Sequence, residues 1–349
     1  MHRRALLTIA IGLLALLAPR APLAAAEPRV TLIYGQWLPG EGGEAVVVRH
    51  PLQQPFGVDF DAVGTMWIVE LAGGRVHRLD AQGQFATLAG NGTKGHDGDG
   101  GPASRATFNG MHNVAVTPGG DVYISDSWNY CVRRIDAKSG HIHTMIGTGR
   151  KGYTGDDGPM GEAAFSFVMC VTLNATKDRL YLTDIDNRRI RVADLKTGRL
   201  SLVAGDGRKG VPKDGDLSTR SPLVDPRAAA PDSKGNVYIL ERGGHALRVV
   251  DGQGRIRTVA GTGQKGDRDG VGTQASFGAP KHLCVDDRDN VYIADEANGR
   301  IRKFDAATGK VSTVLGQGRV KLLSPHGVTW HRGRLYVVDT GHHRILRVE

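Results

Sequence analysis

Short apolar strands that end in an acidic residue recur along this chain. A typical copy reads Val291-Tyr292-Ile293-Ala294-Asp295. Five-residue runs rich in Val, Ile and Tyr predict β-strands. The six copies occupy residues 66–70, 122–126, 180–184, 237–241, 291–295 and 335–339. Their acids stand 44 to 58 residues apart, a period that suits one four-stranded unit with a long loop.

Other positions keep a fixed distance from each acid and identify further strands. A second acid follows after ten residues, and after seven residues a basic residue follows in five of the six units. Arg302 is such a residue, in the strand Arg300-Ile301-Arg302-Lys303-Phe304-Asp305. An outer strand ending in glycine comes next, for example Thr258-Val259-Ala260-Gly261. Each unit thus predicts an inner strand, an acid-ended strand, a basic strand and an outer strand.

The outer strand of one unit is displaced along the chain. Five units carry it after the basic strand, whereas the sixth copy, Thr31-Leu32-Ile33-Tyr34-Gly35, stands near the N-terminus. If this strand completes the unit begun by residues 325–349, the ring closes and leaves no open sheet edge. We therefore predict an all-β fold: a six-bladed β-propeller of four-stranded blades, closed by the N-terminal strand, as a single domain over residues 27–349.

The repeat resembles that of the NHL family of β-propellers. The resemblance is carried by runs such as Asn290-Val291-Tyr292-Ile293-Ala294-Asp295-Glu296-Ala297-Asn298-Gly299-Arg300-Ile301, and it covers essentially residues 30–349. It implies the six-bladed fold but no single activity, because unrelated functions are built on one propeller platform. NHL propellers include RNA-binding and protein-binding modules and, in related six-bladed forms, lyases and lactonases.

The N-terminal 26 residues predict a cleavable signal peptide. A positive start at residues 2–4, an apolar run over 5–18 and the small residues 24–26 form the pattern that a signal peptidase recognises. The mature chain then begins at Glu27 and is exported, periplasmic or secreted. Arg3-Arg4 leaves both an ordinary and a twin-arginine signal open.

Composition agrees with a soluble, turn-rich fold. The chain has 49 Gly among 349 residues and 40% hydrophobic residues, which excludes disorder and supplies a large core. The formal net charge is +9, and removal of the signal peptide reduces this basic excess. An exported protein rarely meets nucleic acid, so we expect no nucleic-acid partner. No later apolar stretch is long enough for a transmembrane anchor, and we expect a monomer.

The central channel mouth is where we expect binding. The starts of the inner strands, the ends of the second strands and the linking loops gather on one face of such propellers, here called the top face. Trp128 and Tyr130 follow a second strand and are expected on this face, where aromatic rings bind sugars or anchor partners. Registering the inner strands places one residue of each blade at the mouth: Phe56, His112, Met169, Pro226, Lys281 and His326. Neighbouring positions add Asn113, Arg227 and His282.

The histidines of the mouth suggest a metal site as an alternative. Pro325-His326-Gly327-Val328 looks like the zinc-binding Pro-His motifs of peptidyl-amidoglycolate lyases, in which three alternate blades each give one histidine. Alternate blades two, four and six here offer His112, Pro226 and His326, so the resemblance lacks its third ligand in blade four. His282 is one residue out of register, in blade five, and is the remaining candidate metal ligand. Three converging histidines provide the open coordination of catalytic zinc.

The strand-ending acids and the Gly/Asp-rich loops predict turns rather than calcium sites. A residue needed once for catalysis need not occur six times, whereas an acid that caps every turn must. Loops such as Lys94 to Pro102 lack the later bidentate acid of a Ca²⁺ loop. The odd number of cysteines excludes a complete disulfide framework. Two alternatives remain, a disulfide between Cys131 and Cys170 or three free thiols. Cys284 is expected in the core.

Two classes of function follow from this sequence. The leading one is an exported binding module whose top face takes a peptide, a glycan or another small molecule. Its expected ligand contacts are Arg227, Lys281, Asn113, Trp128 and Tyr130. The alternative is a metal-dependent lyase or lactonase-like hydrolase, with His112, His326 and His282 holding a divalent ion, zinc or calcium, that polarises a carbonyl or lowers the pKa of a bound water.

Overall fold

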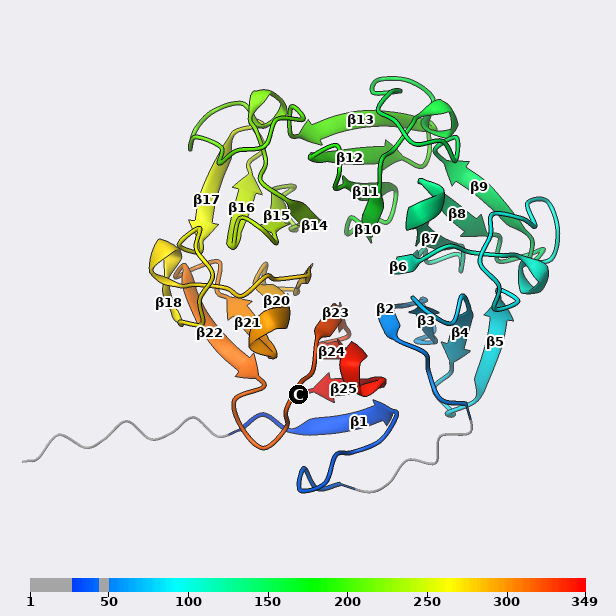
Figure 1. Cartoon of the computed structure of the whole chain (residues 1–349), viewed down its shortest axis with the longest axis horizontal. Helices are drawn as coiled ribbons and strands as arrows, with labels where there is room; N and C mark the ends of the chain where they lie inside the picture. The colour runs from blue at the N-terminus through cyan, green and yellow to red at the C-terminus, as the bar shows by residue number, and fades with distance from the viewer. Residues whose placement is uncertain (1–26, 44–49) are drawn as a thin grey trace, which may run out of the picture.

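A computed structural model describes residues 27–43 and 50–349 of the chain. The strands form six sheets arranged in a ring around a central channel, which confirms the predicted six-bladed β-propeller (Figure 1). The predicted signal peptide, residues 1–26, lies outside the described residues. Nowhere in those two described stretches is there a helix long and apolar enough to cross a membrane.

Each blade is an antiparallel sheet whose strands follow one another from the channel to the rim. Blade 1 contains β2 (Pro55–Phe60), β3 (Met66–Glu70), β4 (Val76–Leu79) and β5 (Phe85–Ala89). Blade 2 contains β6 (Met111–Val116), β7 (Val122–Asp126), β8 (Cys131–Ile135) and β9 (Ile142–Ile146). Blade 3 contains β10 (Val168–Leu173), β11 (Arg179–Asp184), β12 (Arg189–Asp194) and β13 (Arg199–Ala204). Blade 4 contains β14 (Pro226–Pro231), β15 (Val237–Glu241), β16 (Ala246–Val250) and β17 (Ile256–Ala260).

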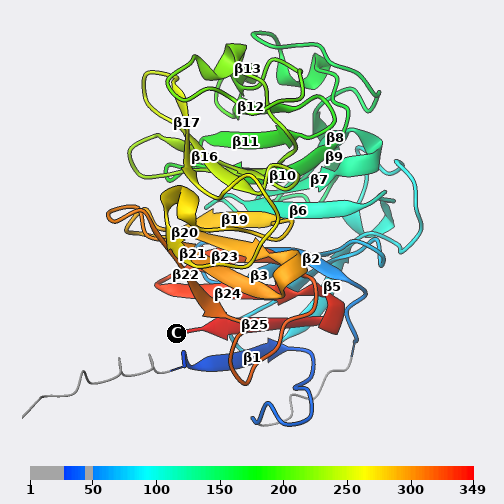
Figure 2. The same cartoon turned by 60° about the vertical axis from the view of Figure 1, so that its left-hand side comes forward.

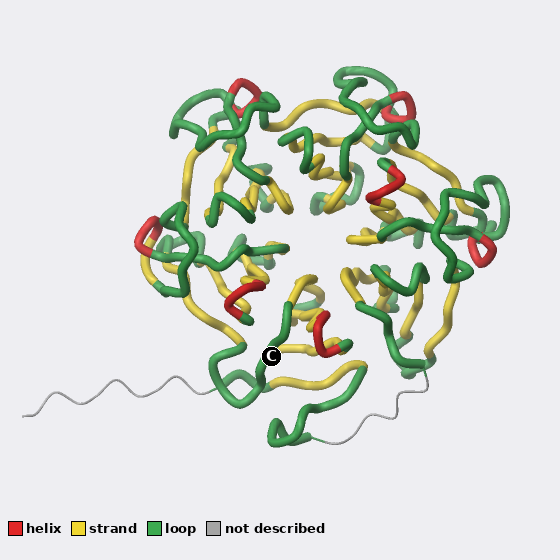
Figure 3. Tube along the Cα trace, viewed as in Figure 1, coloured by secondary structure: helices red, strands yellow, loops and turns green. Residues whose placement is uncertain are grey.

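Blade 5 has one strand more than the repeat predicts. It contains β19 (His282–Val285), β20 (Val291–Asp295), β21 (Arg300–Phe304) and β22 (Lys310–Leu315), and the two-residue strand β18 (Gly270–Val271) pairs with the outer edge of β22. The sequence pattern predicted only a loop there. Short 3₁₀ turns lie partly at the rim and partly near the inner strands (Figure 3). They are η1 (Ala103–Arg105), η2 (Ser127–Asn129), η3 (Met160–Glu162), η4 (Ser218–Arg220), η5 (Gly272–Gln274), η6 (Glu296–Asn298) and η7 (Thr340–His342).

The N-terminal strand closes the ring, as the displaced repeat predicts. Blade 6 contains β23 (Pro325–His331), β24 (Arg334–Asp339) and β25 (Arg344–Val348), and β1 (Val30–Tyr34) pairs with β25 as its outer strand (Figures 1 and 2). Glu41, which follows β1, forms a buried ion pair with Arg344 of β25. Arg344 Nη2 donates to Glu41 Oε1 at 3.0 Å, and its Nε donates to Asp339 at 2.8 Å. The two ends of the domain are therefore joined by main-chain hydrogen bonds and by buried charge.

The strand-ending acids cap turns, as predicted, and each has an intrablade basic partner. Asp295 accepts a hydrogen bond from the Gly278 backbone N–H at 2.6 Å and lies 2.8 Å from Arg302, seven residues further on. Glu241 pairs in the same way with Arg248 at 2.7 Å. These charges are buried, and their pairing and hydrogen bonds offset the cost of removing them from water.

The Gly/Asp-rich loops add a second acid to the same arginines. Asp99 lies 2.7 Å from Arg133, and Asp269 lies 2.6 Å from Arg302. Fully buried phenylalanines hold these loops down at equivalent places, and they are Phe108, Phe165 and Phe277. The loop aspartates thus pair with the buried arginines from the solvent side, since Asp99 and Asp269 are themselves partly exposed.

Candidate ligand site at the channel mouth

A β-bulge near the start of the inner strand points side chains into the channel mouth. In blade 1 the pairing of β2 with β3 is irregular between Pro55 and Gly57, which leaves Phe56 unpaired. Similar irregularities occur at His112 in blade 2, Met169 in blade 3, Arg227 in blade 4 and His326 in blade 6. A bulge re-aims the extra residue away from the sheet, so one fold feature supplies a ring of mouth residues.

Arg227, and not Pro226, is the mouth residue of blade 4. Pro226 pairs with the strand-ending acid Glu241, and the bulge falls on the residue after it. The predicted register was therefore wrong by one residue in this blade, because strand spacing alone does not locate a bulge. Alternate blades two, four and six present His112, Arg227 and His326. An arginine side chain has only donors and stays charged, so it cannot take the place of a third metal-binding histidine.

Hydrogen bonds fix the proton of each mouth histidine. His112 Nδ1 lies 2.8 Å from the Gly110 carbonyl, so Nδ1 carries the proton and Nε2 keeps a free lone pair. Arg227 Nη2 donates to His326 Nε2 at 3.2 Å, which leaves the proton of His326 on Nδ1. In the channel, the Asn113 amide lies 2.7 Å from His282 Nε2. Asn113 Oδ1 accepts from the Val171 backbone N–H, so its NH₂ group faces His282.

All three histidines are neutral at physiological pH. Burial, followed by the charge of Arg227, lowers the pKa of His112 to about 3 and that of His282 to about 4. The same two causes lower the pKa of His326 well below its ordinary value. The Phe56 ring contacts the rings of both His112 and His326, with centroids 5.0 and 3.6 Å away. The mouth therefore combines uncharged imidazoles with one guanidinium.

A cavity of about 390 Å³ lies over this ring on the side of blades 2 to 4. Its wall includes His112, Trp128, Phe167, Met169 and Arg227. Trp128 is 41% exposed, and its ring packs edge-to-face on His112 and Phe167. Tyr130, Lys151 and Arg242 also line the cavity. A volume of this size accommodates a small molecule or the end of a peptide.

Arg227 is buried without an acidic partner. Arg227 is 5% exposed. Among residues 27–43 and 50–349, no carboxylate forms an ion pair with the Arg227 guanidinium. Its Nε has no hydrogen-bond partner, and Nη2 bonds only a neutral imidazole. Burial and the nearby charge of Arg242 lower the pKa of Arg227 to about 10, so the side chain is still cationic at neutral pH. An uncompensated buried charge is costly, and an anionic group in the cavity would offset that cost.

The other predicted contact residues divide between two surroundings. Tyr130 lines the cavity with Trp128. Lys281 is half-buried at the mouth beside Glu296, with 3.9 Å between Nζ and Oε2, and burial lowers its pKa. Asn113 lies deeper, where its amide holds His282 in the channel. The sequence did not predict Phe167 or Arg242 as site residues. Phe167 stands one residue before an inner strand, and Arg242 stands one residue after a strand-ending acid. The other blades carry varied residues at both positions, so no repeat marks them.

The predicted metal ligands do not gather around one point in this structure. His282 and His326 have ring centroids 6.3 Å apart, and Phe56 contacts both His326 and His112. Within the described part of the chain, the three His, Cys, Asp or Glu side chains that bring ligand atoms within 4.8 Å of one another are His96, Asp126 and Cys131. The metal site at His112, His282 and His326 stays a prediction. All three cysteines are free thiols, so the Cys131–Cys170 bridge does not form.

Comparison with known proteins confirms the resemblance to NHL-repeat propellers. No protein-family model matches the chain. It is 27% identical over 238 residues to Protein SUPPRESSOR OF QUENCHING 1, chloroplastic, of Arabidopsis thaliana. The matched region covers 66% of this chain and 22% of that protein. It is 27% identical over 258 residues to human NHL repeat-containing protein 2, covering 61% of this chain and 35% of the relative. The chain thus spans little more than a third, or less, of the length of these relatives.

Solved structures share the fold at low identity. An auxiliary nutrient binding protein from Bacteroides ovatus has a TM-score of 0.66 and 15% identity, over 92% of this chain and 76% of that one. An inactive virginiamycin B lyase from Staphylococcus aureus, solved with quinupristin, has a TM-score of 0.59 and 12% identity, covering 87% of this chain and 97% of the lyase chain. The protein is a six-bladed β-propeller. Within that class its repeats are similar to those of NHL repeat-containing protein 2.

Proposed function

We propose that this chain is an exported binding module whose top-face cavity takes a small molecule or peptide bearing a carboxylate. The observation that carries the proposal is Arg227, a buried guanidinium without a carboxylate partner in the part of the chain that the structure describes. Arginine binds carboxylates with two parallel hydrogen bonds, and such charge-assisted bonds are about twice as strong as neutral ones. The similarity in fold to an auxiliary nutrient binding protein is consistent with a ligand-binding role.

The rest of the cavity suits the remainder of such a ligand. Trp128 and Phe167 offer apolar ring surface, and the free Nε2 lone pair of His112 offers one acceptor. Lys281 and Arg242 lie near Arg227, but each is paired with an acid, Glu296 and Asp225. Asp186 also lines the cavity, and of these three cations Arg227 is the one without an acidic partner in the described part of the chain. Because the three histidines are uncharged, the Arg227 guanidinium, which contacts His326, is the charged group of this cluster. We infer that the ligand pairs an anionic group with an apolar or aromatic part.

The proposal is tested with a library of carboxylic acids, each matched with its carboxamide, in thermal-shift assays. Carboxylates with an aromatic part are expected to raise the Tm, and their amides are not. The variant Arg227→Met is expected to abolish the shift. Arg208→Met is the control, because Arg208 is exposed and pairs with Asp206. Carboxylic acids that raise the Tm of Arg227→Met as much as that of the wild type would overturn the proposal.

The enzyme alternative has a separate test. A divalent ion held by His112 and His326 would have to tolerate the charge of Arg227, which donates to His326. Metal analysis of the purified mature protein, with His112→Ala and His326→Ala beside it, distinguishes the two functions. Near-stoichiometric metal lost in both variants would support a metal-dependent lyase or hydrolase. Export is tested by N-terminal sequencing of the protein from the periplasm or medium, where the expected first residue is Glu27.

A further inference from the structure

Blade 2 carries an unusual side-chain pair at a position that the other blades fill differently. His96 lies two residues after the loop lysine Lys94, and Cys131 begins the third strand. In blade 3 the corresponding residues are Tyr153 and Arg189, with the guanidinium 3.6 Å from the ring centroid. In blade 5 they are Asp267 and Arg300, an ion pair at 2.6 Å.

The correspondence between the blades is structural as well as sequential. The loop lysines each form an isolated parallel β-bridge with the buried phenylalanine that follows in the chain. The pairs are Lys94 with Phe108, Lys151 with Phe165 and Lys265 with Phe277. Cys131 pairs with the strand-ending acid Asp126 in the register in which Arg300 pairs with Asp295. In blade 4 the two places hold Val211 and Ala246. The fold therefore accepts a stacked, a charged or an apolar pair here, and a histidine with a cysteine is not needed for folding.

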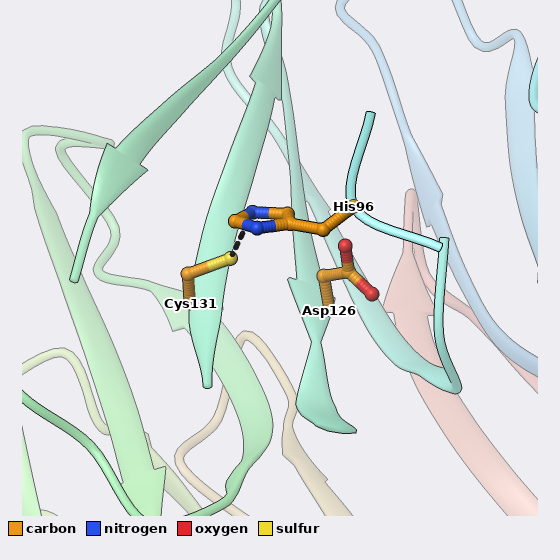
Figure 4. A group of neighbouring side chains, drawn as sticks. All are labelled: His96, Asp126 and Cys131. Carbon is orange, nitrogen blue, oxygen red and sulfur yellow. Dashed lines mark hydrogen bonds between the residues drawn. The ribbon is translucent and has the colours of Figure 1, made fainter. Parts of the chain in front are cut away.

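The geometry of this group matches a metal site (Figure 4). His96 Nε2 lies 3.4 Å from Cys131 Sγ, and a carboxylate oxygen of Asp126 lies within 4.8 Å of both ligand atoms. Two ligands of a tetrahedral zinc ion, at about 2.0 Å for nitrogen and 2.3 Å for sulfur, are roughly 3.5 Å apart. Thr144 Oγ1 lies 3.3 Å from His96 Nε2 and offers an oxygen for the fourth position, which water can also fill.

The charges and hydrogen bonds around the group leave room for a cation. Asp126 accepts from the Asn109 backbone N–H, the Asn129 amide and Arg133, which uses three of about four lone-pair positions. Arg133 is already balanced by Asp99 at 2.7 Å. A Cys131 thiolate and the Asp126 carboxylate then match a doubly charged ion. Cys131 and Asp126 are fully buried, whereas His96 is exposed and gives access from solvent.

We propose that His96, Asp126 and Cys131 bind one zinc-like divalent ion on blade 2, at residues separate from the mouth histidines. The mixed nitrogen, oxygen and sulfur donors suit zinc, which takes all three. Burial, with the neighbouring charge of Asp126, raises the pKa of the Cys131 thiol, so the ion must displace a proton on binding. The ion would tie the loop after β5 to β8 and replace the ring–guanidinium or ion-pair contact of the other blades.

The test uses Co²⁺ as a spectroscopic probe of the metal-free protein. We expect one Co²⁺ per chain with a thiolate charge-transfer band and the visible bands of a tetrahedral site, both removed by added Zn²⁺. Cys131→Ala is expected to abolish the charge-transfer band. His96→Gln changes an exposed side chain and is expected to fold normally while weakening Zn²⁺ binding by at least about 100-fold, more than loss of an outer-shell partner does.

Matched controls locate the site. Cys284→Ser and His326→Ala are expected to leave the thiolate band unchanged, because neither residue is in the group. The double variant His96→Asp and Cys131→Arg copies the blade 5 pair, and is expected to fold without binding Co²⁺. No thiolate band in the wild type, or a band that His96→Gln leaves unaltered, would overturn the proposal. Loss of the band in His326→Ala would place the ion at the channel mouth instead and would equally overturn it.

Discussion

Arg227 donates a hydrogen bond from Nη2 to Nε2 of His326, across 3.2 Å at the centre of the channel mouth. The two residues are 99 positions apart and come from the inner strands of blades 4 and 6. Burial and then the charge of Arg227 keep His326 neutral, and the contact places its proton on Nδ1. Nε of Arg227 has no hydrogen-bond partner. Because a positively charged guanidinium occupies the mouth and donates to the lone pair of His326, the site favours an anion over a cation.

Arg227→Met is expected to stabilise the protein while it removes ligand binding. The substitution replaces a buried, unpaired charge with an apolar side chain of similar length, and comparable replacements of buried ion pairs gain about 1–4 kcal/mol. Denaturant unfolding of the two proteins, with equal m-values, measures the change. A loss of stability would show that Arg227 holds the fold together and is not reserved for a ligand.

Stability is expected to fall as the pH drops from about 6.5 to about 4. The folded-state pKa values of His112 and His282 are about 3 and about 4, below the unfolded value of 6.5. In this window the unfolded chain binds protons that the folded chain does not, so acid favours unfolding, by about 1 kcal/mol per pH unit for each histidine. Asp184, whose pKa burial raises to about 6, acts in the opposite direction and reduces the net slope. Burial also raises the pKa values of other aspartates, which act in the same direction as Asp184: Asp59, Asp126 and Asp295.

Chemical denaturation of the wild type and of His282→Asn at pH 7, 6 and 5 isolates the histidine contribution. The variant is expected to show a shallower dependence of the free energy of unfolding on pH. Equal slopes in the two proteins would contradict the assignment of His282 as a buried neutral imidazole.

Glu41→Gln is expected to weaken the closure of the ring. Glu41 and Arg344 are both buried, and without the Glu41 charge Arg344 keeps Asp339 as its remaining carboxylate partner. The expected cost is therefore about 1.5–3 kcal/mol, the contribution of hydrogen bonds to a charged group. Burial opposes the ionisation of Glu41, but the hydrogen bonds from Arg344, Leu38 and Lys321 outweigh it and lower the pKa to about 2. The stabilisation by this carboxylate is therefore complete above about pH 4.5 and lost as the pH falls toward 2.

The matched control for Glu41→Gln is Glu349→Gln. Glu349 pairs with Arg29 and Arg347 at the surface, where an ion pair contributes about 0–1 kcal/mol. Thermal unfolding of both variants is the measurement. If Glu41→Gln costs no more than Glu349→Gln, the Glu41–Arg344 pair does not contribute to closure.

Gly110→Ala is expected to displace Trp128 from the cavity wall. A Cβ at residue 110 would lie 1.9 Å from the Trp128 ring, and the backbone there has φ +75°, which favours glycine. The substitution is expected to shift the tryptophan fluorescence and to weaken binding of any ligand that stacks on Trp128. Gly120→Ala, which also has positive φ but lies against Ala137, is the control for backbone strain alone. Identical fluorescence in both variants would contradict the packing of Trp128 over Gly110.

The fold could be predicted from the sequence because its determinants repeat. The acid at the end of each second strand and the basic residue seven positions later are periodic, since every blade needs the same buried pair, as Asp295 and Arg302 form it. The sixth unit has Leu346 seven residues after its acid instead of a basic residue. There Arg344, two residues earlier, pairs with Asp339 and Glu41. The strand β18 was missed because its residues, Gly270 and Val271, lie in a loop pattern and pair only through the geometry of blade 5.

The site could be predicted only in part, because its geometry depends on features that do not repeat. The sequence located His112, His326 and Trp128 at the top face, but the bulge that brings Arg227 into the ring in place of Pro226 has no sequence signal of its own. The tautomers of the histidines depend on contacts such as His112 with Gly110, which exist only in the folded chain. Convergence of side chains from different blades is a property of the ring and not of one repeat.

The most direct test of the central claim, that the channel mouth binds a carboxylate through Arg227, is calorimetric titration with one matched ligand pair. A carboxylic acid that stabilises the protein and its carboxamide would be titrated into the wild type and Arg227→Met. The wild type is expected to bind the carboxylate at least about tenfold more tightly than the carboxamide, since a hydrogen bond to a charged group contributes about 1.5–3 kcal/mol. Arg227→Met is expected not to distinguish the two ligands. Equal affinities of the wild type for the two ligands would contradict carboxylate binding by Arg227.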